Sequence, residues 1–120
     1  MKYSVYQINL SEAQIDLVNE KGFDAVPEQK VKMDMQFDFG GKGIENIASQ
    51  AFADGHYGKV CMIEANNLDQ VFHVGNVGPE SLIDRGPLNT QMASISVGDI
   101  IEDEAGSKFV VSNFGFKEVA

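Results

Sequence analysis

The last quarter of the chain constrains the fold most strongly, because short apolar runs there alternate with glycine-containing turns. The segment from Ser94 to Phe116 reads SISVGDIIEDEAGSKFVVSNFGF. Gly98-Asp99 marks a first corner, and Glu104–Gly106 marks a hairpin loop in which glycine can adopt a left-handed conformation without a Cβ clash. The pattern predicts a C-terminal β-meander or half-barrel with strands at Met92–Ser96, Ile100–Asp103, Lys108–Ser112 and Phe116–Val119.

The beginning of the chain carries a strand signal followed by a helix signal. Tyr3–Ile8 has apolar residues punctuated by polar ones and is predicted to be a strand. A helix is predicted over Glu12–Lys21, because Ser11 and Gln14 have the spacing of a capping box and Gly22 supplies a stop. The residues expected to face the core from this helix are Ile15, Leu17 and Val18.

The middle of the chain contains one ambiguous segment. Phe23–Lys30 is predicted to be a connection, with Pro27 as its breaker. Met33–Phe39 alternates methionine or phenylalanine with Asp and Gln, which is the period of a strand with one face in the core; a helix is the alternative. The elements predicted after it are a helix over Ile44–Phe52, a strand over Lys59–Glu64 and a short helical turn over Leu68–Phe72 that Asn67 caps.

A glycine- and proline-punctuated segment, Gly75–Asn89, separates these elements from the C-terminal strands. At about fifteen residues it is long for a loop in a compact domain, so it is a candidate binding loop. The candidate binding residues in and beside it are His73, Asn76 and Arg85.

Together these elements predict one α+β domain over residues 1–120, with two main helices packed on a mostly antiparallel sheet. No apolar run approaches the ~20 residues that span a bilayer, and the N-terminus has no signal-peptide core, so we expect a cytoplasmic protein without membrane contact. The single cysteine, Cys61, lies in the apolar run Val60–Ile63 and is expected to be a small buried hydrophobe.

The net charge of the chain distinguishes between nucleic acids and basic proteins as partners. The formal net charge is −9, and residues 61–120 hold nine acidic residues against only Arg85, Lys108 and Lys117. Such a chain repels a nucleic-acid backbone and attracts basic partners. The acidic second half is therefore either a solvated surface or a docking face for a basic host or phage protein.

One glycine-rich turn could contact a ligand. Gly40, Gly41, Lys42 and Gly43 precede the predicted second helix, where main-chain amides and the lysine could meet a phosphate. The turn lacks both the Walker spacing and the Gly-x-Gly-x-x-Gly order, so a tight strand-to-helix turn is favoured over phosphate binding.

Metal and catalytic signals are weak. His56 and His73 are too far apart for a zinc motif, and Asp34 and Asp38 are explained more simply by the polar face of a strand than by a cation site. No nucleophile, base and acid with a recognisable spacing is found. We therefore expect no catalytic residue, no metal and no cofactor.

Two parts of the chain resemble known families. Asn67–Phe72, Ser94–Ile101 and Phe109–Val119 resemble the closing part of YodL-like domains of mobile elements. Tyr3–Asn9 and Met35–Gly41 are similar to small uncharacterised proteins of tailed phages, notably those of marine cyanobacteria. The resemblance implies a phage or mobile-element accessory protein and supplies no catalytic residue to carry over.

Three function classes remain open at this point. The first is a non-catalytic acidic protein-binding module that uses the second half and Gly75–Asn89. The second is a nucleic-acid binder built on a small PUA-like β-barrel, against which the net charge argues. The third is a small-molecule-binding domain that uses the Gly40–Gly43 turn. Edge strands of the meander could also pair across a homodimer.

Overall fold

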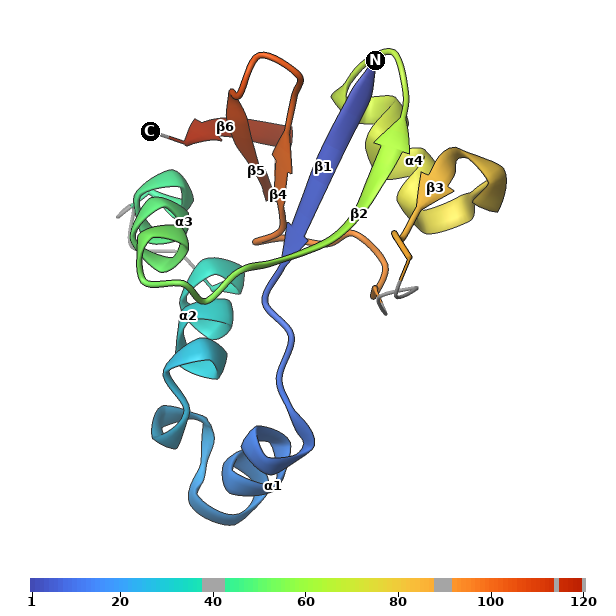
Figure 1. The fold of residues 1–120 in the computed structure, drawn as a ribbon. Coiled ribbons are helices and arrows are strands. Elements are labelled where there is room, and N and C mark those ends of the chain that lie inside the picture. Colours follow the sequence, from blue (N-terminus) through green and yellow to red (C-terminus); the bar gives the residue numbers. More distant parts are fainter. Residues whose placement is uncertain (38–42, 88–91, 114, 120) are drawn as a thin grey trace.

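The computed structural model describes residues 1–37, 43–87, 92–113 and 115–119, and contains four α-helices and six strands in that part of the chain (Figure 1). The strands are β1 Lys2–Gln7, β2 Gly58–Glu64, β3 Ile83–Asp84, β4 Ile100–Glu102, β5 Lys108–Ser112 and β6 Gly115–Val119. The helices are α1 Glu12–Lys21, α2 Pro27–Gln36, α3 Ile44–Ala53 and α4 Leu68–Val77, with short 3₁₀ helices η1 Phe23–Ala25 and η2 Glu80–Leu82. None of the helices in these ranges is long and apolar enough to cross a membrane.

The strands form one sheet in the order β3-β2-β1-β4-β5-β6, and every neighbouring pair is antiparallel. The predicted α+β class is confirmed. The last three strands form the expected meander, because the Glu104–Gly106 turn joins β4 to β5 and Gly106 has a φ of +88° there. The sheet stays open, since β3 and β6 lie at its two ends, and the strands do not close into a barrel.

Both faces of the sheet are covered, so the core has two halves. Residues directly opposite each other in antiparallel strands share a face, which places Val5, Cys61 and Ile101 together. Helix α4 packs on this face through Val71 and Val74. The opposite face packs against α2 and α3. The buried residues of this half of the core, from the sheet and from the two helices together, are Ile8, Met35, Ile44, Ala48, Ile100, Val110 and Val119. The sequence predicted two main helices, and the sheet is covered by three.

The strand predicted over Met33–Phe39 is wrong in its described part, which begins inside a helix. Pro27 occupies the first turn of α2, where its missing N–H costs nothing, and Glu28 favours the same end of the helix dipole. Val31 and Met35, four residues apart, then face the core together, and Met35 is only 2% exposed. Phe37, which the alternation places in the core with Met35, is 55% exposed.

The long loop predicted over Gly75–Asn89 is also wrong in its described part. Helix α4 continues to Val77, and η2 and β3 follow before the described residues end at Pro87. The short helical turn predicted at Leu68 is therefore a full helix. Gly75 lies within this helix at a close approach to Ile95: a Cβ at that position would lie 2.7 Å from Cγ1 of Ile95.

The strand predicted over Met92–Ser96 does not form. Ala93 pairs with a side chain: its N–H donates to Oε1 of Gln7 over 3.0 Å, and its C=O accepts from Nε2 of Gln7 over 2.9 Å. Gln7 is only 3% exposed. Its side-chain amide makes the two hydrogen bonds to Ala93 that the main chain of a neighbouring strand would otherwise make. The segment lies beside the sheet without joining its ladder.

Helix α1 has the predicted bounds and both hydrogen bonds of its capping box. Ser11 N donates to Oε1 of Gln14 over 2.8 Å, and Gln14 N donates to Oγ of Ser11 over 3.2 Å. Its predicted core stripe is wrong, because α1 has no buried residue and Ile15 is 46% exposed. Figure 1 shows the reason: α1 lies away from the sheet, at the far end of an extended connection from β1.

Candidate functional site

The glycine turn falls mostly outside the described residues, since Gly40, Gly41 and Lys42 are not among them. Gly43 is described, and it is the N-cap of α3 with a φ of +84°. A Cβ there would lie 2.6 Å from Oε1 of Glu45, which is the end of a flexible side chain, so it is the positive φ that favours glycine at this position. This explains Gly43 as a turn residue without invoking a ligand.

The other three candidate residues do not form one site. His73 and Asn76 lie exposed on α4, and Nδ2 of Asn76 donates to the carbonyl of Phe72 over 2.9 Å. Arg85 follows β3, and its Nη1 lies 2.7 Å from Oε2 of Glu80. Its guanidinium is therefore already paired with a carboxylate of its own segment.

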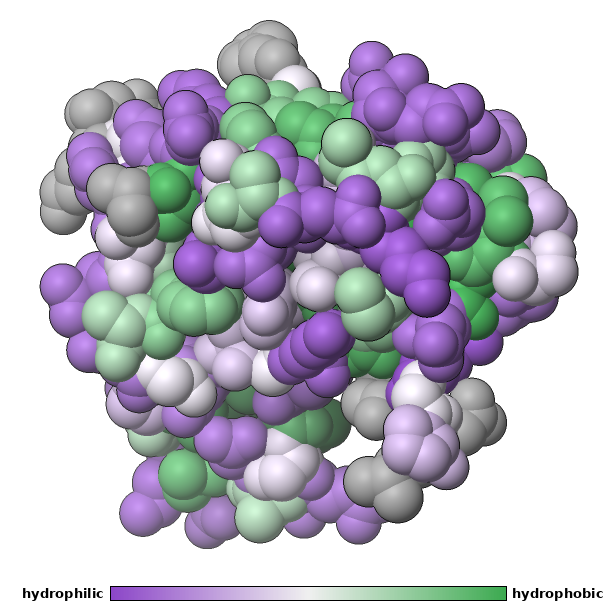
Figure 2. Space-filling model, turned by 45° about the horizontal axis from the view of Figure 1, so that its top comes forward, coloured by the Kyte–Doolittle hydropathy of each residue, from purple (hydrophilic) through white to green (hydrophobic). Residues whose placement is uncertain are grey.

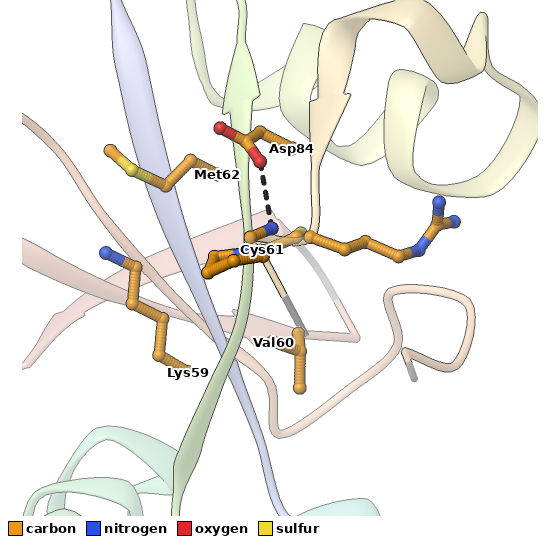
Figure 3. Close-up of a pocket in the computed structure, with 8 residues that line it drawn as sticks. Lys59, Val60, Cys61, Met62 and Asp84 are labelled. Atoms are coloured by element: carbon orange, nitrogen blue, oxygen red, sulfur yellow. Dashed lines mark hydrogen bonds between the residues drawn. The ribbon is translucent and has the colours of Figure 1, made fainter. Parts of the chain in front are cut away.

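A small pocket of about 260 Å³ lies at the β2–β3 end of the sheet, next to Cys61 and Arg85 (Figure 3). Figure 3 shows Asp84 beside Cys61; Oδ1 of Asp84 accepts from the main-chain N–H of Gly86 over 2.8 Å. Burial raises the pKa of the Cys61 thiol to about 11, so the sulfur stays protonated near neutral pH. The pocket therefore offers no thiolate near neutral pH, and Cys61 is the buried hydrophobe that the sequence predicts.

A larger hollow runs between α4 and the strands β5 and β6. We call it the α4–β6 groove and define it by Leu68, Asp69, Phe72, Phe109, Phe116 and Glu118. It consists of two adjoining hollows of about 710 and 510 Å³ that share Asp69 and Phe116. Figure 2 shows one face of the molecule, on which hydrophobic patches lie between hydrophilic residues.

The groove follows from local folding rules. Asn67 caps α4 by accepting the N–H of Gln70 over 2.8 Å, which starts the helix at Leu68. Because Val71 and Val74 face the core, Asp69 and Phe72 are turned outward. The β5–β6 register places two pairs on the α4 side of the sheet, Val111 opposite Phe116 and Phe109 opposite Glu118.

The charged residues that line the groove are all acidic: Asp69, Asp103 and Glu118. None of them takes part in a salt bridge among the described residues. The basic residues of the second half are paired elsewhere, in Arg85–Glu80, Lys108–Glu102 and Lys117–Glu45. The groove therefore combines aromatic surface with negative charge that no neighbouring cation compensates.

One wall of the groove, Ile95–Val97, is held by a buried carboxylate. Oδ2 of Asp99 accepts from Ser96 N over 2.9 Å and from Nε2 of Gln7 over 3.0 Å. Burial raises the pKa of Asp99 to about 6, although these hydrogen bonds and Lys32 favour the ionised form. The wall is thus fixed to β1 through polar contacts inside the protein.

The remaining chemistry of the described residues does not suggest a reaction. His56 follows α3, and its Nδ1 lies 3.4 Å from Oε1 of Glu28 in α2. No group of three or more His, Cys, Asp or Glu side chains among the described residues is arranged to hold a metal ion.

Comparisons of the chain with protein-family models, with curated proteins and with solved structures found no match. The site must therefore be judged from its own geometry. Sequence reasoning did not single out the groove residues. The available signals were Phe116 and Glu118, two residues apart on a predicted strand, and Asp69 next to Leu68 in a predicted helical turn.

Proposed function

We propose that this protein is a non-catalytic binding module that holds a basic, partly apolar segment of a partner protein in the α4–β6 groove. The observation that supports it is the groove itself, in which Phe72, Phe109 and Phe116 line hollows whose charged residues are all carboxylates. Aromatic residues in a hollow supply the buried area that anchors a partner, and uncompensated charge selects its sign.

The same features favour a protein segment over the other classes. The carboxylates of Asp69, Asp103 and Glu118 repel phosphates, which disfavours nucleic acid and nucleotides in this groove. Its two hollows extend along α4 and β6, a shape that suits a chain segment better than one compact molecule. The accessory role in a phage or mobile element, which the sequence resemblance implies, belongs to this proposal, with a basic host or phage protein as the partner.

The test is a selection of random decapeptides displayed against the immobilised protein. We expect the enriched peptides to combine Lys or Arg with apolar residues and to bind more weakly as salt increases. The groove variant Asp69→Lys/Glu118→Lys should lose at least about tenfold in affinity for them.

The matched control is Asp16→Lys/Glu20→Lys, which makes the same change of net charge on the exposed face of α1. It should bind like the wild type, and circular dichroism should show that both variants are folded. If both variants lose binding equally, the attraction is nonspecific charge. If no peptide is enriched over an unrelated acidic protein, the proposed function is wrong.

A further inference from the structure

The two edges of the sheet differ in how they are protected. An edge strand presents unpaired main-chain N–H and C=O groups, and proteins shield such edges with short strands, prolines, bulges or charges. The β3 edge is shielded, since β3 has only the two residues Ile83–Asp84 and lies between Pro79 and Pro87. The β6 edge has five residues, Gly115–Val119, without a proline.

Strand β6 is also regular. Its five residues pair with β5 in one continuous register without a bulge. The one basic residue on it, Lys117, is directed to the α3 side, where its Nζ lies 3.7 Å from Oε2 of Glu45. Lys117 therefore faces α3, which itself packs on β6, and Glu45 partly compensates its charge there, although the lysine side chain is about half exposed.

The groove lies directly beside this edge. Phe116 and Glu118 are on the α4 face of β6, and Lys117 between them is on the α3 face. A strand added along β6 would place every second side chain next to Phe116 and Glu118. The open edge and the groove would then be used by the same segment.

The geometry points to β-strand addition: the basic partner segment joins the sheet as a strand along β6 and places alternate side chains in the α4–β6 groove. This inference rests on the proposed function and specifies its partner. The segment is extended, with an apolar residue opposite Phe116 and a Lys or Arg two positions away, opposite Glu118. The residue between them faces the α3 side.

A second copy of the chain fits this edge less well. Each chain has a net charge of −9, and pairing β6 with its own copy would bring two acidic grooves together. The charge of the groove is instead complementary to a basic segment. Sedimentation of the free protein checks this choice, because a dimer that Phe116→Lys dissolves would make the second copy the occupant and overturn the inference.

The probe is the blocked octapeptide Leu-Thr-Lys-Thr-Leu-Thr-Lys-Thr, which has leucine and lysine on the same face of a strand. Its control, Leu-Lys-Thr-Thr-Leu-Lys-Thr-Thr, has the same composition with leucine and lysine on opposite faces. We expect the first peptide to bind the isotope-labelled full chain at least about tenfold more tightly. Amide hydrogen exchange should slow at alternate residues of Gly115–Val119, whose N–H groups face the added strand.

N-methylation of the probe provides a second readout. Methyl groups on one set of alternate residues should abolish binding, and on the other set should leave it nearly unchanged, because only every second amide pairs with β6. Equal binding of the two octapeptides, binding of neither, or unchanged exchange in β6 would each overturn strand addition. If displayed decapeptides still bind the groove in that case, the proposed function stands without it; if they do not, both fail.

Discussion

Substituting Asp99 by asparagine should stabilise the protein at neutral pH. Asp99 lies between Ser96 and the sheet, with 9% of its surface exposed. The groups that face it are the amide of Gln7 from β1, the Ser96 N–H, Lys32 from α2 and Tyr57 from the segment before β2. Asparagine keeps an oxygen that can accept the two hydrogen bonds of Oδ2 and removes the buried charge.

The size of the effect follows from the pKa. Burial raises the pKa of Asp99 from 3.8 to about 6, which means that the folded state holds the proton more tightly than the unfolded state. This group's contribution to the free energy of unfolding therefore falls as pH rises from about 4 to 6 and stays at its lower value above that range. A difference of roughly 2 in pKa corresponds to about 3 kcal/mol, so Asp99→Asn should gain up to that amount above pH 7.

Urea unfolding followed by circular dichroism between pH 4 and 8 measures this effect. The difference in unfolding free energy between Asp99→Asn and the wild type should be near zero at about pH 4, where the buried carboxyl is protonated, and should rise through about pH 6. The matched control is Asp16→Asn, which removes the same charge from an exposed position on α1. Parallel pH curves for Asp99→Asn and the wild type would show that the burial argument is wrong.

Three further predictions test the packing. Gly75→Ala should lower the unfolding free energy by about 1–3 kcal/mol in urea, against the usual preference of helices for alanine, because the new methyl group meets Ile95; a gain would contradict the close packing. Cys61 should react with a disulfide reagent at pH 8 on the order of 100-fold more slowly in the folded than in the unfolded chain, and fast labelling would show that the thiol is accessible. Ser11→Ala should remove about 1 kcal/mol from α1 and reduce helical circular dichroism, while the global unfolding midpoint hardly moves; a large shift would mean that α1 is part of the core.

The sequence predicted the elements whose signals are local. The helix Glu12–Lys21, the strands around β1, β2, β5 and β6, and the turn at Glu104–Gly106 all have caps, glycines or alternation within a few residues of each other. These signals depend on hydrogen bonds that close over short distances along the chain. They predict that an element forms, but not what it packs against. The apolar residues of α1 therefore looked like core residues in the sequence, although none of them is buried.

The segment Met33–Phe39 shows how a local pattern misleads. Its alternation is that of a strand, but its described residues, 33–37, lie in helix α2 and at the C-cap of that helix. The stronger signal lay earlier, in Pro27 and Glu28 at a helix start, and in Val31 and Met35 at helical spacing. In a segment as short as this one, the signals for the start of a helix should therefore count for more than the alternation of apolar and polar residues.

The groove could not be predicted because its residues come from four different parts of the chain. Asp69 and Phe72 come from α4, Ile95 from a segment without regular structure, and Phe109 and Phe116 from neighbouring strands. Each looks like an ordinary core or surface residue in the sequence, and only the strand order brings them together. The acidic composition alone predicts that the partner is positively charged. The position of the binding site depends on where the basic residues are already paired. Since Arg85, Lys108 and Lys117 pair with Glu80, Glu102 and Glu45, none of these three cations is paired with a carboxylate of the groove beside the β6 edge.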